Sequence, residues 1–334
     1  MGTTDKTIKS HKSRRDFIKL SAMGGAAMIL PLEVFPHSFK KESLEIGLIA
    51  DVHQDIMHDA EARLQAFMDE ANQRKLDFII QLGDFCIPRD QNLNFMSIWN
   101  SYSGPKYHVL GNHDTDLGFT KEQTRTFWDM PSNYYSFDKK GLHFVVLDGN
   151  DPNPKPWEGY NRYIGEEQQR WLKEDLEKTD KPTIIFSHQT LELEDGGVAN
   201  LKEIQKILEA ANASAGYQKV LCCLSGHHHT DFMTKINGIY YVQVNSASYR
   251  WVGGDYQTIR YSKEIDAQHK WIKYTIPYKE SLFTFMKIEK DKITLEPRKT
   301  EFVGPGPKEM GMPEPAPHDP IVPTITGFQM KLKS

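Results

Sequence analysis

The sequence has little cysteine. Its 334 residues include three cysteines, an odd number that is too few for a disulfide framework. Cys222 and Cys223 stand together in the apolar run 220–224, which is typical of a buried strand rather than of reactive thiols. The third, Cys86, stands alone. The chemistry of this chain therefore has to come from other side chains.

The sequence also lacks a strong excess of charge of either sign. It holds 41 Lys and Arg against 45 Asp and Glu, a formal net charge of −4 at pH 7. Neither nucleic acid nor an anionic membrane is implied as a partner, because both are bound by basic surfaces. With 39% hydrophobic and 26% charged residues, the composition is that of a globular protein, long enough for one large α/β domain.

Long hydrophobic runs are absent too. The apolar stretch 20–30 is too short to form a transmembrane span, unless it remains uncleaved as an anchor. It follows the basic segment Ser13-Arg14-Arg15-Asp16-Phe17-Ile18-Lys19, and this order is typical of a signal peptide. The segment resembles twin-arginine leaders, which implies a signal peptide at 1–40, the twin-arginine export machinery as a partner and a periplasmic location. An ordinary amphipathic N-terminal helix is the alternative.

The first half of the remaining chain alternates strands with helices. Apolar segments 44–50, 76–82 and 107–110 are predicted as core strands. Between them, 59–73 and 91–101 have the spacing of amphipathic helices. This βαβαβ order predicts an α/β fold with parallel strands covered by helices.

The second half continues with a mixed pattern. An antiparallel pair is predicted at 134–137 and 142–147, helices at 166–178 and 198–211, and strands at 182–186, 217–224 and 239–245. A terminal hairpin pairs 282–288 with 293–297. Seven prolines in 303–323 indicate an extended tail. The predicted domain is therefore 41–302, followed by a proline-rich tail at 303–334.

Carboxylate, imidazole and amide side chains follow the predicted strands. Because ligands in open α/β sheets bind at the carboxyl ends of the strands, these side chains are expected to meet at one edge. Imidazole combined with carboxylate suits Mn, Fe, Zn or Co better than Ca or Mg, and a carboxylate can bridge two cations. The candidate ligands are Asp51, His53, Asp84, Asn112, His188, His227 and His229.

The motifs Asp51-Val52-His53, Gly83-Asp84, Gly111-Asn112-His113-Asp114, Ser187-His188 and Gly226-His227-His228-His229 resemble the calcineurin-like metallophosphoesterase superfamily. The resemblance covers about 44–250 and implies a four-layer α/β/β/α sandwich of two mixed β-sheets. It also implies a phosphohydrolase that cleaves phosphoester bonds with a hydroxide bound to two divalent metal ions. Asp51, His53, Asp84 and His229 would hold one metal, and Asp84, Asn112, His188 and His227 the other. His113 would face the leaving group with Asp114 as its partner, and His228 would not be a ligand.

Two departures from relatives narrow this expectation. Purple acid phosphatases carry a tyrosine where this chain has Ile87, and they lack a histidine at the position of His53, so an iron–tyrosinate centre is not expected. Phe85-Cys86-Ile87 also predicts an apolar pocket wall. The stretches around 134–148 and 184–188 resemble the branch with cyclic-nucleotide phosphodiesterases and pyrophosphatases of nucleotide diphosphates.

The substrate is expected to be a small phosphorylated molecule. The favoured prediction is a phosphodiesterase or pyrophosphatase that acts on nucleotide-type molecules, and the alternative is an exported phosphomonoesterase. A metal-binding scaffold without turnover is the non-enzymatic alternative. Residues predicted to contact substrate, or else to belong to the core, are Trp157, Tyr160, Tyr249, Arg250 and Trp251.

Overall fold

The computed structural model describes residues 43–332. The predicted signal peptide at 1–40 lies outside the described residues. Within 43–332, no helix has both the length and the hydrophobicity needed to cross a membrane.

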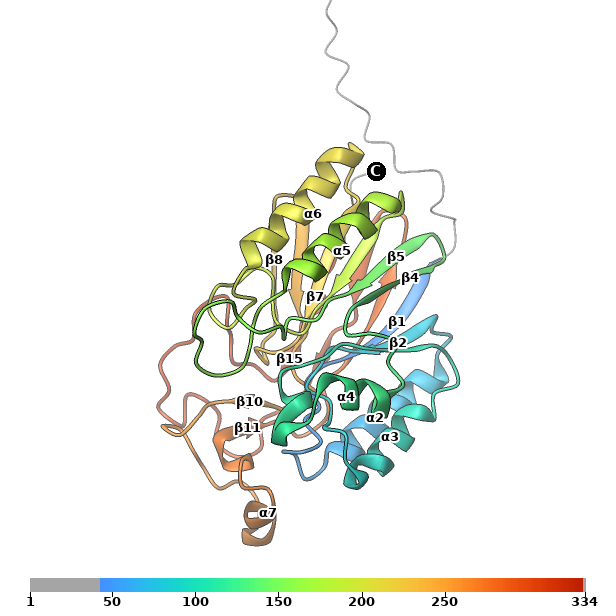
Figure 1. Cartoon of the computed structure of the whole chain (residues 1–334). Coiled ribbons are helices and arrows are strands. Elements are labelled where there is room, and N and C mark those ends of the chain that lie inside the picture. Colours follow the sequence, from blue (N-terminus) through green and yellow to red (C-terminus); the bar gives the residue numbers. More distant parts are fainter. Residues whose placement is uncertain (1–42, 333–334) are drawn as a thin grey trace, which may run out of the picture. The chain divides into compact units, whose positions relative to one another are not determined.

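Two six-stranded sheets form the centre of the fold (Figure 1). The first has the order β16-β13-β12-β1-β2-β3, and the second β4-β5-β6-β7-β9-β8. In the first sheet, β1 (Leu44–Ile49), β2 (Phe78–Gln81) and β3 (Lys106–His108) are parallel, whereas β12 (Thr284–Ile288), β13 (Lys292–Leu295) and β16 (Gln329–Lys331) are antiparallel additions. In the second, β5 (Leu142–Val146), β6 (Thr183–Phe186), β7 (Val220–Ser225) and β9 (Ile239–Gln243) are parallel, with β4 (Tyr135–Lys139) and β8 (Phe232–Ile236) antiparallel at the edges.

Alternating side chains assemble the layers. In and after β2, Phe78, Ile80 and Leu82 point into the core between the two sheets, while Ile79 points outward. This period of two is what a strand buried on both faces requires. Ile79 packs with Phe67 of α2 (Ala60–Gln73) and neighbours from α3 (Leu93–Asn100).

Helices cover the outer face of the second sheet as well. α5 (Glu166–Lys178) and α6 (Leu201–Ala215) lie side by side over this sheet (Figure 1). They bury Leu172 and Ile204 against Ile185. The fold is thus a four-layer α/β/β/α sandwich of two mixed sheets, which confirms the expectation that the family resemblance implied.

Several elements were absent from the sequence-based expectation. They are α4 (Lys121–Trp128), the edge strand β8, the pair β10 (Tyr249–Trp251) and β11 (Thr275–Pro277), α7 (Lys263–Gln268), and the pair β14 (Arg298–Lys299) and β15 (Thr324–Ile325). Short 3₁₀ turns lie at Asp90–Asn92, His113–Gly118 and Ile272–Tyr274. Elsewhere boundaries shift by a few residues: the helix expected at 198–211 is α6, and the strand expected at 217–224 is β7.

The segment after residue 302 differs from a free tail. Most of it consists of turns and irregular backbone, but β16 pairs with β13 and completes the first sheet. Met330 is fully buried there, in the core between the sheets. The sheet therefore continues beyond the boundary drawn at 302, because the edge of β13 is covered by the end of the chain.

Candidate metal centre

Loops from both sheets bring the predicted ligands together. Asp51 and His53 follow β1, Asp84 follows β2, and Asn112 follows β3 of the first sheet. His188 follows β6, and His227 and His229 follow β7 of the second sheet. Because the parallel strands of each sheet end at one edge, the sandwich places these side chains across the gap between the sheets.

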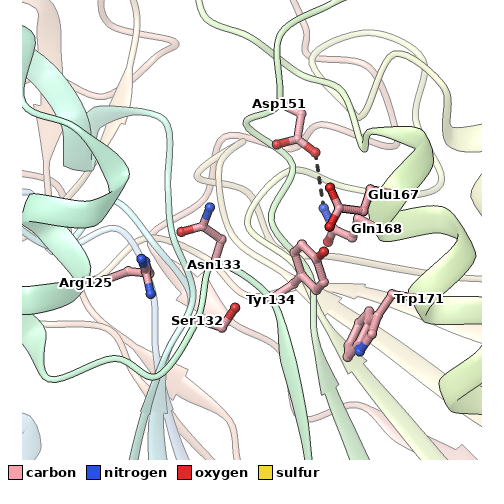
Figure 2. Close-up of a pocket in the computed structure, with 8 residues that line it drawn as sticks. All are labelled: Arg125, Ser132, Asn133, Tyr134, Asp151, Glu167, Gln168 and Trp171. Atoms are coloured by element: carbon pink, nitrogen blue, oxygen red, sulfur yellow. Dashed lines mark hydrogen bonds between the residues drawn. The ribbon is translucent and has the colours of Figure 1, made fainter.

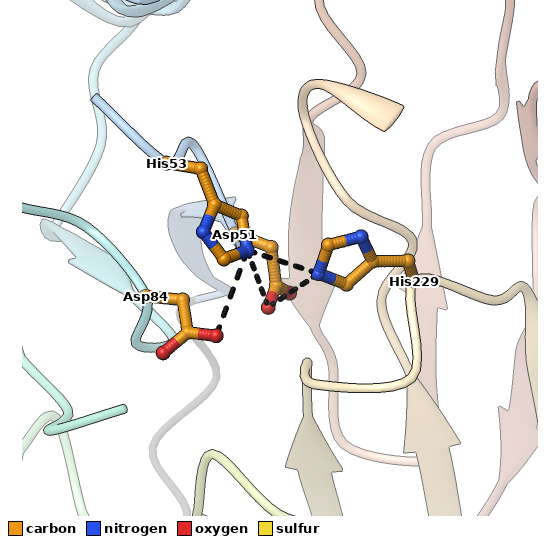
Figure 3. A group of neighbouring side chains, drawn as sticks. All are labelled: Asp51, His53, Asp84 and His229. Atoms are coloured by element: carbon orange, nitrogen blue, oxygen red, sulfur yellow. Dashed lines mark hydrogen bonds and ion pairs between the residues drawn. The ribbon is translucent and has the colours of Figure 1, made fainter. Parts of the chain in front are cut away.

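Asp51, His53, Asp84 and His229 form one buried group (Figure 3). The Nε2 atoms of His53 and His229 lie 3.1 Å apart. His53 Nε2 lies 3.5 Å from Asp84 Oδ2, and His229 Nε2 lies 3.2 Å from Asp51 Oδ1. Four ligand atoms therefore converge on one point, as they do at metal sites.

Asp84, His188 and His227 form a second group that shares Asp84 with the first. His188 Nε2 lies 3.2 Å from Asp84 Oδ2 and 3.2 Å from His227 Nδ1. Asn112 joins this group, since its Oδ1 lies 3.1 Å from His188 Nε2. All seven residues identified from the sequence are thus brought together, with Asp84 in the middle.

Backbone carbonyls orient two of the imidazoles. His188 Nδ1 lies 2.8 Å from the carbonyl oxygen of Leu82, and His229 Nδ1 lies 2.8 Å from that of Tyr249. A proton on each Nδ1 leaves the Nε2 lone pair directed into the cluster, the arrangement that metal-binding histidines adopt.

The electrostatics of the cluster also suit a cation. Burial lowers the pKa of His53 and of His227 well below the usual histidine value, so both rings are neutral ligands. Burial opposes the charge of Asp84, but the neighbouring His188, His113 and His53 together outweigh it and hold the carboxyl pKa well below its usual range. Lone pairs that face one another at 3.1–3.2 Å are favourable only around a proton or a cation. The buried Asp/His cluster fits a dinuclear metal site.

The backbone of the ligand loops is unusual. Five of the seven candidate ligands have left-handed φ angles between 51° and 70°, which non-glycine residues adopt rarely and at a cost of about 1–3 kcal/mol each. They are Asp51, His53, Asp84, His227 and His229. Such strain is characteristic of functional sites, and the sequence pattern did not reveal it.

Two glycines permit the close approach of the loops. A Cβ on Gly226 would lie 2.4 Å from Asp51 Oδ2, and a Cβ on Gly111 would lie 2.2 Å from the amide nitrogen of Asp84. Neither contact is sterically possible, so the glycine that precedes each of these motifs is required by the packing of the neighbouring ligand.

The partner of His113 differs from the expectation. His113 Nδ1 lies 2.8 Å from Asp116 Oδ2, in the 3₁₀ turn that follows Asn112. Burial opposes a positive charge on His113, but the carboxylates of Asp84 and Asp116 outweigh it and raise its pKa to about 9. These two carboxylates favour the protonated ring, which is the form that can donate a proton.

Asp114 binds the backbone of the ligand loops instead of His113. Its carboxylate accepts hydrogen bonds from the backbone amides of Gly111, Asp84 and Phe85, at 2.7, 2.9 and 2.7 Å. It is buried, and its oxygens are bound to these loop amides rather than to the ring of His113. The predicted Asp114–His113 pair is therefore corrected to Asp116–His113.

The predicted substrate contacts separate into two groups. The Tyr160 hydroxyl donates to Asp116 Oδ1 at 2.9 Å and lies 3.1 Å from His113 Nδ1, so Tyr160 reaches the site from the loop 151–163. Trp157 on the same loop is exposed and donates through Nε1 to the carbonyl of Tyr160. Both side chains are exposed on this loop and could contact a substrate.

The other three predicted substrate contacts lie on β10. Tyr249 is buried, with its ring centre 5.0 Å from that of His53 and 4.8 Å from that of His229, so it is a wall of the cluster. Arg250 is paired with Asp319. Trp251 is exposed on β10, 5.8 Å from the ring of Tyr274. The burial of Tyr249 agrees with the alternative that its ring belongs to the core.

Two cavities lie near these elements. A narrow one of about 30 Å³ opens beside the cluster, between His53, Asp84 and His113, and its apolar wall is formed by Phe85, Cys86 and Ile87 as expected. A larger one of about 440 Å³ lies between the end of α4 and the start of α5 (Figure 2). Arg125, Tyr134, Glu167 and Trp171 line the larger cavity, which includes none of the candidate ligands.

Comparison with known families agrees with this geometry. Residues 44–231 match the model of the calcineurin-like phosphoesterase family. The chain belongs to this family. It is accordingly a hydrolase that acts on phosphoester bonds. No match was found among curated proteins.

Solved structures show the same fold. A dimetal phosphatase from Danio rerio matches with a TM-score of 0.55 at 15% identity, over 78% of this chain and 98% of that one. GAP50, the anchor in the inner membrane complex of Plasmodium, matches with a TM-score of 0.52 at 14% identity, over 87% and 90% of the two chains. At these identities the similarity concerns the fold alone.

Proposed function

We propose that this member of the family is a dinuclear metallohydrolase of small phosphoesters. Asp51, His53, Asp84 and His229 hold one divalent cation, and Asp84, Asn112, His188 and His227 hold the other. The observation that carries this proposal is the position of Asp84, which belongs to both groups of converging ligand atoms. The mixed imidazole and carboxylate set favours Mn, Fe, Zn or Co.

The residues around the centre support a division of labour. Bound divalent cations would supply Lewis-acid activation of water and of the phosphoryl group. His113 donates a proton to the leaving oxygen. Asp116 and the Tyr160 hydroxyl hold the imidazole ring of His113 in place. Asp114 fixes the amides of the loops that carry Asp84 and Asn112.

The favoured substrates are diesters or pyrophosphates of nucleotide type. The exposed ring of Tyr160 beside His113 and the exposed ring of Trp157 on the same loop support this choice, because a nucleobase can stack on such rings. A phosphomonoesterase is the alternative. Turnover of nitrophenyl mono- and diesters, cyclic nucleotides and nucleotide sugars, with each metal supplied in turn, distinguishes the two.

Substitution of Asp84 tests the metal centre. Asp84→Ala should reduce the content of both metals, because one carboxylate serves both groups, whereas His53→Ala should affect mainly the first and His188→Ala the second. Elemental analysis of the purified proteins measures this. An Asp84→Ala protein that retains two equivalents of metal would refute the shared ligand, and a wild type that binds metal but turns over no ester of the panel would favour a scaffold.

A further inference from the structure

The end of the chain crosses the loop that carries His227 and His229. We call residues 319–326 the C-terminal strap. Both carboxylate oxygens of Asp319 accept hydrogen bonds from Arg250, at 2.6 and 2.5 Å. The hydroxyl of Thr230 donates to the carbonyl of Pro320 at 2.8 Å. The backbone amide of Thr326 donates to the carboxylate of Asp231 at 3.0 Å.

Arg250 connects the strap to the ligand loop. Its Nη1 donates not only to Asp319 but also to the carbonyl oxygen of His228, at 2.7 Å. His228 lies between two candidate ligands, His227 and His229, whose φ angles are 70° and 51°. The guanidinium therefore binds the backbone between two residues with left-handed φ angles. Asp319 fixes the direction of that guanidinium, because a bidentate pair allows one planar orientation.

The strap also holds the neighbouring segment 245–249. Asn245 Nδ2 donates to the carbonyls of Val322 and Thr324, at 2.8 and 2.9 Å. In the same segment, the Ser246 hydroxyl donates to the backbone carbonyl of Asp51 at 2.9 Å. The carbonyl of Tyr249 orients the ring of His229. The strap thus contacts both polypeptide segments that support the first metal group from the second sheet.

We infer that the C-terminal strap is a positioning element of the metal centre, and that Asp319 is a positioning residue that acts through Arg250. This inference rests on the proposed function. Asp319 does not contact the ligands, and 31% of its side chain is exposed, so its contribution to the core is small. Its contribution is to the conformation of the His227–His229 loop, and hence to metal affinity.

Asp319→Asn tests this inference in the full chain. The amide keeps the size of the side chain but loses the bidentate ion pair. Metal affinity should fall about 10–100-fold, the effect of removing an outer-shell partner. Competition with a chelator measures the affinity for Mn²⁺, and activity should recover at high Mn²⁺ with an unchanged kcat. Glu301→Gln is the matched control, because Glu301 also forms an ion pair, with Lys279, on the exposed surface. Asp319→Glu should retain most of the affinity.

The outcomes separate positioning from folding. The metal-free Asp319→Asn and Glu301→Gln proteins should unfold at the same temperature. Asp319→Asn should differ from the control only in its lower affinity for metal. If Asp319→Asn does not fold, Arg250→Lys replaces it: lysine keeps the charge but cannot bind Asp319 by two bonds while also binding His228. Native Mn²⁺ affinity in the folded variant overturns the inference. If the wild-type protein binds Mn²⁺ but hydrolyses no ester, the proposed function is refuted. The comparison of Mn²⁺ affinity between wild type and Asp319→Asn still tests the role of the strap in that case.

Discussion

His113 lies beside the candidate metal ligands without belonging to their groups. Its ring centre is 5.3 Å from that of His53, and its Nδ1 is bound to Asp116. His113→Asn should therefore leave metal content and fold nearly unchanged, while turnover falls about 10²–10⁴-fold, the range for a positioned general acid. The loss should be small for nitrophenyl esters, which leave as stabilised anions, and large for alkyl or sugar esters, whose leaving groups need a proton. Rates across esters of graded leaving-group pKa check this, and an equal deficit across the series would remove the leaving-group role.

Asp114 and Asp116 provide a contrast between two neighbouring carboxylates. Asp116→Asn should retain both metals and show a weaker form of the His113 defect. Asp114→Asn should lose metal and about 1–3 kcal/mol of stability, since an NH₂ group then replaces one of the two oxygens that accept the three amide hydrogen bonds, and opposes at least one of these donors. Elemental analysis and thermal unfolding of the two proteins, measured side by side, decide this. Equal metal loss in both would contradict the assignment.

The identity of the ligands could be predicted at the level of residues, but their surroundings could not. Each ligand follows an apolar strand, and this position is visible in the sequence. The sequence indicated Asp114 rather than Asp116 as the partner of His113. The correct partner depends on the 3₁₀ turn 113–118, which brings the side chain of Asp116 close to the ring of His113. Had that turn been predicted, the i, i+3 spacing would have indicated Asp116. The left-handed φ angles leave no signal in the sequence.

At the scale of elements, one histidine joins a strand pair to a helix. His143 on β5 lies 2.8 Å from Asp138 on β4 through Nδ1 and 2.8 Å from Asp175 on α5 through Nε2. Both ring nitrogens face carboxylates, so the protonated ring satisfies both contacts. Burial opposes this charge, but the two hydrogen-bonded carboxylates outweigh it and raise the pKa of His143 above its ordinary value.

His143→Gln should therefore lower stability in a pH-dependent way. A raised pKa in the folded state gives stability that is complete below about pH 6.5, the unfolded value, and is lost as the pH rises through the folded value. The variant should be less stable by about 1–2 kcal/mol at pH 5.5, and the difference should narrow towards pH 9. Denaturant unfolding with chelator present measures it without interference from metal. A difference that stays constant from pH 5.5 to 9 would show that packing, not charge, is lost.

Elements with strong periodicity were predictable, and short edge elements were less so. The helix at 166–178 and the hairpin at 282–297 are found within a few residues of their predicted bounds. Two missed elements did carry local signals. Thr120 and Gln123 form a capping box at the start of α4. Asn237 and Gly238, both with positive φ, form the tight turn that connects β8 to β9. By contrast, β16 has only three residues, and its place depends on the distant edge of β13.

At the scale of the whole molecule, export remains a prediction that rests on Arg14-Arg15. Replacing both arginines by lysine should abolish transfer of the folded protein to the periplasm, because the twin-arginine route depends on this pair. Cell fractionation, with activity measured in each fraction, follows the protein. Transfer of the lysine variant in full amount would exclude this route.

The metal centre draws its ligands from both sheets, and this has a consequence for the order of folding. Asp51 and His229 are separated by more than half of the chain, so the first ligand group is not complete until the two sheets have docked. Contacts that form after the rate-limiting step change the rate of unfolding and leave the rate of folding almost unaffected. Bound metal should accordingly prolong the lifetime of the folded chain without hastening its formation, and metal supply then determines how long each molecule survives.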